Sequence, residues 1–255
     1  MTGIKLLGFH LMHFTDFKNK MYQFILFFQP FFFLSIVKFM FVMKPNVDQG
    51  KYLFAVAILS AWNYVLYSSG SSLVAEKWSG TLEMLLTSRT SLFKIILIKT
   101  ITNASIGLLS MLITIIYAVF VFGFNLHIHN IFYLSLTIVV LIFSFVALGN
   151  ILAIVFGLFA NVFEYQDLIV YPVAILIGIF YPVDSFPLII QFFSYIFPMT
   201  WIIEGLYLQL QGKADAGMSP LTIGFILSLL YIYLSYFIIK RMEGKFRESN
   251  RLGVF

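Results

Sequence analysis

The chain has 255 residues, of which 61% are hydrophobic and 11% are charged, and its formal net charge is +5. A water-soluble domain carries about 25% charged residues, so a soluble globular fold is excluded and most of the surface is predicted to face lipid. The chain has no cysteine, which excludes disulfides, thiolate chemistry and cysteine-based metal sites.

Residues 1–20 place His10, His13 and Asp16 among apolar residues, and no small-residue cleavage site follows a short apolar run. This pattern differs from that of a cleavable signal peptide. It predicts an amphipathic helix that lies in the membrane interface before the first span.

Six apolar runs are candidates to cross a bilayer, which takes about 20 residues. They are Tyr22–Met43, Tyr52–Val74, Ile95–Phe124, Ile131–Ala160, Leu168–Pro182 and Leu221–Ile239. Together they predict an all-α integral membrane protein that forms a single domain over residues 1–255.

The segment between the fifth and sixth runs, residues 184–212, is apolar but contains Pro187, Pro198 and Glu204. These residues disfavour a straight seventh span. Two half-length helices, Phe186–Phe197 and Met199–Gln211, are favoured instead, as a re-entrant pair that dips into the outer leaflet and returns.

Lysine and arginine predict the orientation. With six spans, twelve of these residues fall on the side of the two termini, three fall on the opposite side, and Lys38 lies inside the first span. Both termini, including the tail 240–255, are therefore expected in the cytoplasm. The positive charge is a topology signal with attraction to anionic lipid and gives no indication of nucleic acid.

The polar segment Glu76–Ser88, EKWSGTLEMLLTS, interrupts the apolar sequence between the second and third runs. Ser79 is a candidate cap for a short helix that begins near Gly80. Thr81 and the leucines that follow give this helix an apolar side. Residues 76–90 are thus predicted to form a cytoplasmic helix that contacts a partner in water; the alternative is a plain interfacial connector.

Three further features have two interpretations each. Ser68, Ser69, Gly70, Ser71 and Ser72 permit close helix approach, either between two copies of the chain or along an inner pathway, or simply within one bundle. Glu204 is either a gate residue or an acid paired at the outer rim, for example with Lys213. Lys38 either reaches the outer interface or meets an anionic substrate. His127 and His129 are expected in a loop, with no metal site.

Two stretches of the sequence resemble the ABC-2 type permeases, the membrane subunits of bacterial ATP-binding-cassette exporters. Glu76–Ser88 is similar to the family's E-R-x-x-G-T-L-E-x-L-L-x-T-P segment. The second stretch, Phe180–Pro187 with Phe197–Leu206, is similar to its F-x-P-x-x-x-x-P and N-P-[LM]-T-x-x-x-E region. Lys77, Ser88, Phe197 and Tyr207 depart from the family pattern.

The resemblance implies roles for two sets of residues. Contact with the ATPase is implied for Glu76, Gly80, Thr81, Leu82, Glu83 and Leu86, and an outer gate is implied for Pro182, Pro187, Pro198 and Glu204. No residue is expected to be catalytic, because the chain lacks a G-x-x-x-x-G-K-[ST] loop and any convergent catalytic set.

The partners implied by the resemblance are two ATP-binding subunits, which would hold ATP and Mg²⁺, and a second permease copy in a homo- or heterodimer. The chain itself is expected to bind no cofactor. Its cargo would be an amphipathic drug, antibiotic, peptide or lipid-linked compound moved out across the bacterial cytoplasmic membrane. Export of polysaccharide or teichoic acid is the alternative cargo, and an ATPase-independent secondary transporter or a membrane enzyme are the rival classes.

Overall fold

The computed structural model describes residues 20–44, 48–87, 90–126, 130–157 and 162–251. Within these ranges every regular element is helical and no strand occurs. The predicted interfacial helix of residues 1–20 and the pair His127 and His129 fall almost entirely outside the described residues. The elements are α2 (Lys20–Gln23), η2 (Phe24–Phe28), α3 (Gln29–Met43), α4 (Gln49–Gly70), α5 (Ser72–Trp78), α6 (Thr81–Thr87), α7 (Leu92–Ile116), η3 (Tyr117–Val121), α8 (Ile131–Gly157), α9 (Val162–Leu176), η4 (Val183–Ser185), α10 (Leu188–Ser194), α11 (Pro198–Leu210) and α12 (Ala214–Arg251).

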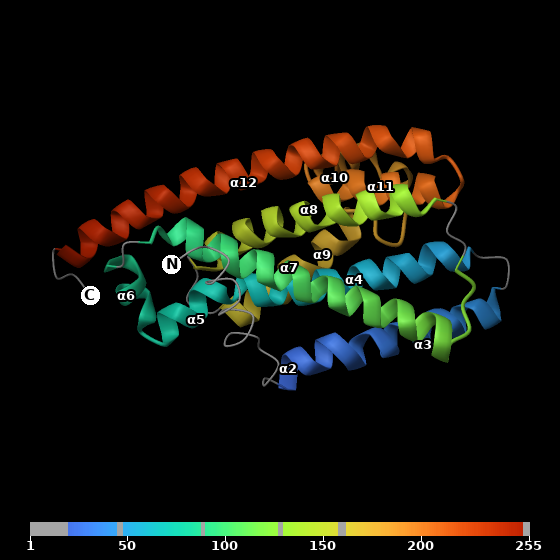
Figure 1. Ribbon diagram of the computed structural model, residues 1–255, viewed down its shortest axis with the longest axis horizontal. Helices are drawn as coiled ribbons and strands as arrows, with labels where there is room; N and C mark the ends of the chain where they lie inside the picture. The colour runs from blue at the N-terminus through green and yellow to red at the C-terminus, as the bar shows by residue number, and fades with distance from the viewer. Residues whose placement is uncertain (1–19, 45–47, 88–89, 127–129, 158–161, 252–255) are drawn as a thin grey trace.

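Helix α4 is the centre of the bundle and runs through its middle in Figure 1. The apolar window of Gln49–Trp78 is entirely buried, whereas only 22% of the corresponding window of Ala214–Lys245 is buried. Close packing is possible because Gly107 of α7 has no side chain: a Cβ there would lie 2.4 Å from the Val65 side chain. On another side, the Trp62 indole donates a hydrogen bond to the Val170 carbonyl of α9 at 3.1 Å.

Five of the six predicted spans are confirmed as long apolar helices: Lys20–Met43, Gln49–Trp78, Leu92–Val121, Ile131–Gly157 and Ala214–Lys245. A bent pair, α10 and α11, passes the same test of length and hydropathy when its two helices are taken together. The predicted all-α membrane fold is therefore confirmed.

The predicted fifth span, Leu168–Pro182, is placed wrongly. Helix α9 begins earlier, at Val162, and ends at Leu176. Its 15 residues extend about 22 Å, less than the ~30 Å of a hydrocarbon core. The chain turns at Gly178, whose φ of +82° ends the helical path although apolar residues continue. Residues 162–167, which precede the predicted span, belong to α9 as well.

The last helix is longer than predicted. Leu221–Ile239 was the expected span, but α12 has 38 residues, or about 57 Å, and extends well beyond the thickness of the hydrocarbon core. The predicted tail after residue 240 thus continues as helix through Arg251.

The bundle has two distinct ends in Figure 1. The first, called the α6 end, holds α5, α6 and the C-terminal part of α12. The second, called the α11 end, holds α10, α11 and the start of α12. Each group of predicted site residues lies toward one of these ends, apart from the serine-glycine segment, which lies inside the bundle.

Candidate functional site

The polar segment at the α6 end folds as two short helices joined by a sharp turn, the α5–α6 elbow (residues 72–87). Gly80 forms the turn with a φ of +69°, and a Cβ at this position would have no heavy atom within 4 Å. Glycine is therefore favoured here by backbone conformation and not by lack of space. The predicted cap is wrong: the Ser79 hydroxyl donates back to the Ala75 carbonyl of α5 at 2.8 Å and makes no cap for α6.

Glu76 connects three helices at this end. Its carboxylate accepts a hydrogen bond from the Thr81 hydroxyl at the start of α6 and forms an ion pair with Lys99 of α7. The side chains of Glu76 and Lys99 are both only 13% exposed. At such a site the ion pair stabilises both charges, because water solvates neither of them well. Glu76 thus fixes the start of α6 against α7.

Leu82 is a second residue that attaches α6 to the bundle. It packs on a buried cluster that includes Leu73, Leu92 and Ile239, from α5, α7 and α12. In the same region the Glu243 carboxylate of α12 accepts a hydrogen bond from the Leu92 amide at 3.1 Å, at the first turn of α7. A displacement of α6 therefore acts directly on both α7 and α12.

Two large apolar side chains of the elbow are exposed, one on each of its helices. Trp78 is 64% exposed and Met84 is 73% exposed. Lys77, between Glu76 and Trp78, is exposed as well. The side chains of Glu83 and Leu86, two of the predicted contact residues, lie outside the described part of the chain. The backbone places both in α6.

The serine-glycine segment lies inside the bundle. A Cβ on Gly70 would lie 2.4 Å from the Phe156 ring of α8, and one on Gly149 would lie 2.9 Å from the Ser69 hydroxyl. Ser71 shares a hydrogen bond of 3.0 Å with the Tyr22 hydroxyl. Ser68 and Ser72 are buried too. These contacts are those of packing within one bundle, and a role along an inner pathway stays a prediction.

At the α11 end, each predicted gate proline stands at the start of a helix. Pro182 precedes η4, Pro187 precedes α10 and Pro198 is the first residue of α11. Proline suits such positions because its fixed φ matches the helix and its missing N–H would have no helical partner there. Helices α10 and α11 meet at an angle of 100°, as expected of the predicted re-entrant pair.

Hydrogen bonds and close packing hold this bend in place. The Trp201 indole donates to the Tyr195 carbonyl at 3.0 Å, and the Tyr231 hydroxyl of α12 donates to the Ile196 carbonyl at 3.1 Å. Helix α11 also touches α12 through facing glycines: a Cβ on Gly205 would lie 2.9 Å from the Gly217 carbonyl oxygen. These contacts fix the angle between α10 and α11.

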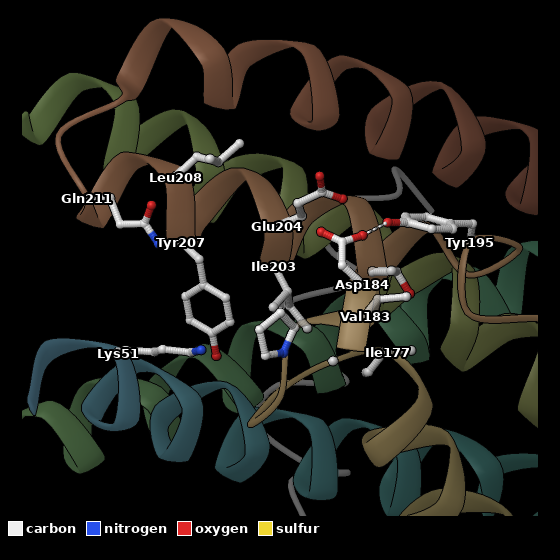
Figure 2. Close-up of a pocket in the computed structure, with 13 residues that line it drawn as sticks. Lys51, Ile177, Val183, Asp184, Tyr195, Ile203, Glu204, Tyr207, Leu208 and Gln211 are labelled. Atoms are coloured by element: carbon white, nitrogen blue, oxygen red, sulfur yellow. Dashed lines mark hydrogen bonds between the residues drawn. The ribbon is translucent and has the colours of Figure 1, made fainter. Parts of the chain in front are cut away.

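A cavity of about 170 Å³ opens between the start of α4, the turn after α9, and α11 (Figure 2). Its polar lining comprises three charged residues, Lys51, Asp184 and Glu204, two tyrosines, Tyr195 and Tyr207, and the neutral residues Thr200 and Gln211. The Tyr195 hydroxyl donates to the Asp184 carboxylate at 3.1 Å. The Lys51 ammonium lies 5.0 Å from the centroid of the Tyr207 ring, and the Tyr207 hydroxyl donates to the Ile179 carbonyl.

Glu204 points toward Asp184 at one side of this cavity, and Lys51 lies at the other (Figure 2). Among the described residues, no hydrogen bond or ion pair joins the Glu204 carboxylate to Lys213, so Lys213 is not the partner suggested for it. Whether Glu204 is a gate residue or an acid of the outer rim stays a prediction. The Lys38 ammonium donates to the Phe122 carbonyl, just after η3, at 2.8 Å and lies near the Phe124 ring. Its two possible roles, at the outer interface or with an anionic substrate, stay predictions.

Sequence reasoning did not identify Lys51, Asp184, Tyr195 and Tyr207 as site residues, although all four line the cavity. Lys51 was counted only as a topology signal, because nothing in its neighbourhood indicates that it meets α11, about 150 residues later. A detectable signal existed for Asp184 alone, since it lies between Pro182 and Pro187 in the stretch that resembles the family pattern.

Comparison with known proteins agrees with this arrangement. Residues 13–210, more than half of the chain, match the family model described as ABC-2 type transporter. The match includes both the elbow and the cavity. A comparison with curated proteins finds no match.

Proposed function

The chain belongs to the ABC-2 type transporter family, and from this premise we propose that it is the permease subunit of an exporter driven by ATP hydrolysis in a separate subunit. It is a multi-pass membrane protein and a transport subunit. Two copies, identical or related, would assemble with two ATP-binding subunits that hold ATP and Mg²⁺. The cargo class is an amphipathic drug, antibiotic, peptide or lipid-linked compound.

The observation that carries this proposal is the α5–α6 elbow. It places Trp78 and Met84 on the surface, while Glu76 and Leu82 fix the same segment to α7 and α12. An exposed apolar contact with a firm internal attachment is what a mechanical connection to a motor protein requires. The charge asymmetry supports a cytoplasmic location for this end, with the α11 end facing outward in the bacterial cytoplasmic membrane.

Replacing both Trp78 and Met84 by serine is expected to reduce binding of the ATP-binding subunit at least tenfold. Burial of one large apolar side chain contributes about 1.5–3 kcal/mol, and ~1.4 kcal/mol corresponds to a factor of ten in affinity. The measurement is co-purification of a co-expressed ATP-binding subunit from the same organism with a tagged permease. Leu188→Ser is the matched control, because Leu188 is also highly exposed but lies at the α11 end. If the unaltered chain, the double variant and Leu188→Ser recover equal amounts of the ATP-binding subunit, Trp78 and Met84 do not form the contact with it.

A further inference from the structure

The cavity at the α11 end contains opposite charges on separate walls. Asp184 and Glu204 lie together at one side, and Lys51 lies at the other, beyond the Tyr207 ring (Figure 2). No ion pair among the described residues joins Lys51 to either carboxylate. A ligand that carries only one charge would meet only one of these two walls.

The acidic wall is suited to an organic ammonium group. Two neighbouring carboxylates repel one another unless a cation lies beside them. The Tyr195 hydroxyl occupies one oxygen of Asp184, while the Glu204 carboxylate has no such donor among the described residues. The Tyr195 ring, whose centroid lies 4.8 Å from that of Trp201, adds an aromatic surface, which attracts ammonium groups. A calcium ion is disfavoured, because it takes six to eight oxygen ligands.

The basic wall is suited to an anionic group. The Lys51 side chain lies over the Tyr207 ring at 5.0 Å. Tyr207 is 8% exposed and its hydroxyl is used by the Ile179 carbonyl, so the ring is fixed beneath the ammonium. Lys51 lies in the first turn of α4, where its amide donates to the Asp48 carboxylate at 3.2 Å. Its ammonium, over the Tyr207 ring, is the positive charge on this wall of the cavity.

The size of the cavity limits the ligand. Pockets for drug-sized molecules measure about 300–1,000 Å³, and this one measures about 170 Å³. It admits a headgroup or a small solute but not a whole amphipathic drug.

We propose that this cavity binds a small zwitterionic group, with its ammonium between Asp184 and Glu204 and its phosphate or similar anion at Lys51. The aminophosphate headgroup of a lipid and a free aminophosphate share this chemistry. The site requires neither ATP nor a partner subunit, so it goes beyond the proposed function and is tested apart from it.

The test uses the purified full chain in phosphatidylglycerol nanodiscs, titrated with phosphoethanolamine in a calorimeter. We expect saturable binding that weakens at least tenfold in Lys51→Gln and in Asp184→Asn combined with Glu204→Gln. Ethanolamine alone and inorganic phosphate alone should also bind at least tenfold more weakly than phosphoethanolamine. Asp215→Asn is the control: Asp215 is an acid at the same end that accepts from Tyr133 and does not line the cavity. Thermal unfolding of each variant checks that it is folded.

A second arm replaces part of the phosphatidylglycerol with phosphatidylethanolamine. If phosphoethanolamine no longer binds in these discs, the lipid headgroup occupies the cavity and is the ligand. If phosphoethanolamine binds as before, the ligand is a free solute. The proposal is overturned if folded variants bind phosphoethanolamine as the unaltered chain does, if phosphate or ethanolamine alone binds equally well, or if calcium binds in its place. None of these outcomes bears on whether the elbow binds an ATPase.

Discussion

Replacing Glu76 by alanine is expected to destabilise the protein by about 3 kcal/mol, because Lys99 would keep a largely buried charge and lose its ion pair with Glu76. The start of α6 would also lose the acceptor for the Thr81 hydroxyl. The measurement is thermal unfolding of the purified chain in detergent. Lys77→Ala is the control, since Lys77 is exposed on the same short helix and surface changes usually stay within about 0.5 kcal/mol.

A double variant separates the ion pair from other effects of the substitution. Glu76→Met combined with Lys99→Met removes both charges, so it should be more stable than either single methionine variant. Additive losses in the double variant would show that the two side chains do not stabilise one another, and the description of Glu76 as the connection between α6 and α7 would be wrong.

Replacing Gly80 by valine is expected to displace α6 and to reduce co-purification of the ATP-binding subunit at least tenfold. A left-handed conformation costs an ordinary L-residue about 1–2 kcal/mol, and more for a β-branched one, so the elbow would relax away from the φ of +69° seen here. The position of Met84 on α6 relative to Trp78 on α5 would then change. The measurement is partner recovery with a tagged permease, together with thermal unfolding.

Gly80→Asn is the matched variant, because asparagine tolerates the left-handed region and the space around the Cβ is open. It should retain partner binding close to that of the unaltered chain. If valine and asparagine behave alike, the turn at Gly80 does not position the docking surface.

Much of the fold could be predicted because lipid imposes a simple pattern. A run of about 20 apolar residues favours a helix in lipid, because the backbone hydrogen bonds are then made within the segment. Five spans and the bend at Pro198 therefore followed from hydropathy and proline. The ends of helices were less predictable. At Gly178 the chain turns within a continuous apolar run, and only the conformation of one glycine ends the helix.

The residues of the elbow were predicted better than those of the cavity, because the elbow is formed by residues close together in sequence. Thr81 and Leu82 are neighbours in sequence, and a local pattern was enough to place them on one short helix, which begins directly after the turn at Gly80. The cavity combines Lys51 with Asp184 and Glu204, which become neighbours only when α4 packs beside α11. Lys99 was likewise counted only for topology, since its ion pair with Glu76 depends on the crossing of α5 and α7.

Cysteine labelling provides the most direct test of the central claim that ATP used outside the membrane acts, through the elbow, on the opposite end of the bundle. The chain has no cysteine of its own. Thr200 lines the cavity and is 1% exposed, so a near-isosteric Thr200→Cys places one protected thiol there. In proteoliposomes that contain the complex, ATP hydrolysis should raise the rate of labelling by a membrane-impermeant maleimide at least tenfold. The account is contradicted if a complex that hydrolyses ATP labels at the same rate with and without the nucleotide, or if ATP accelerates labelling of the chain without its partner.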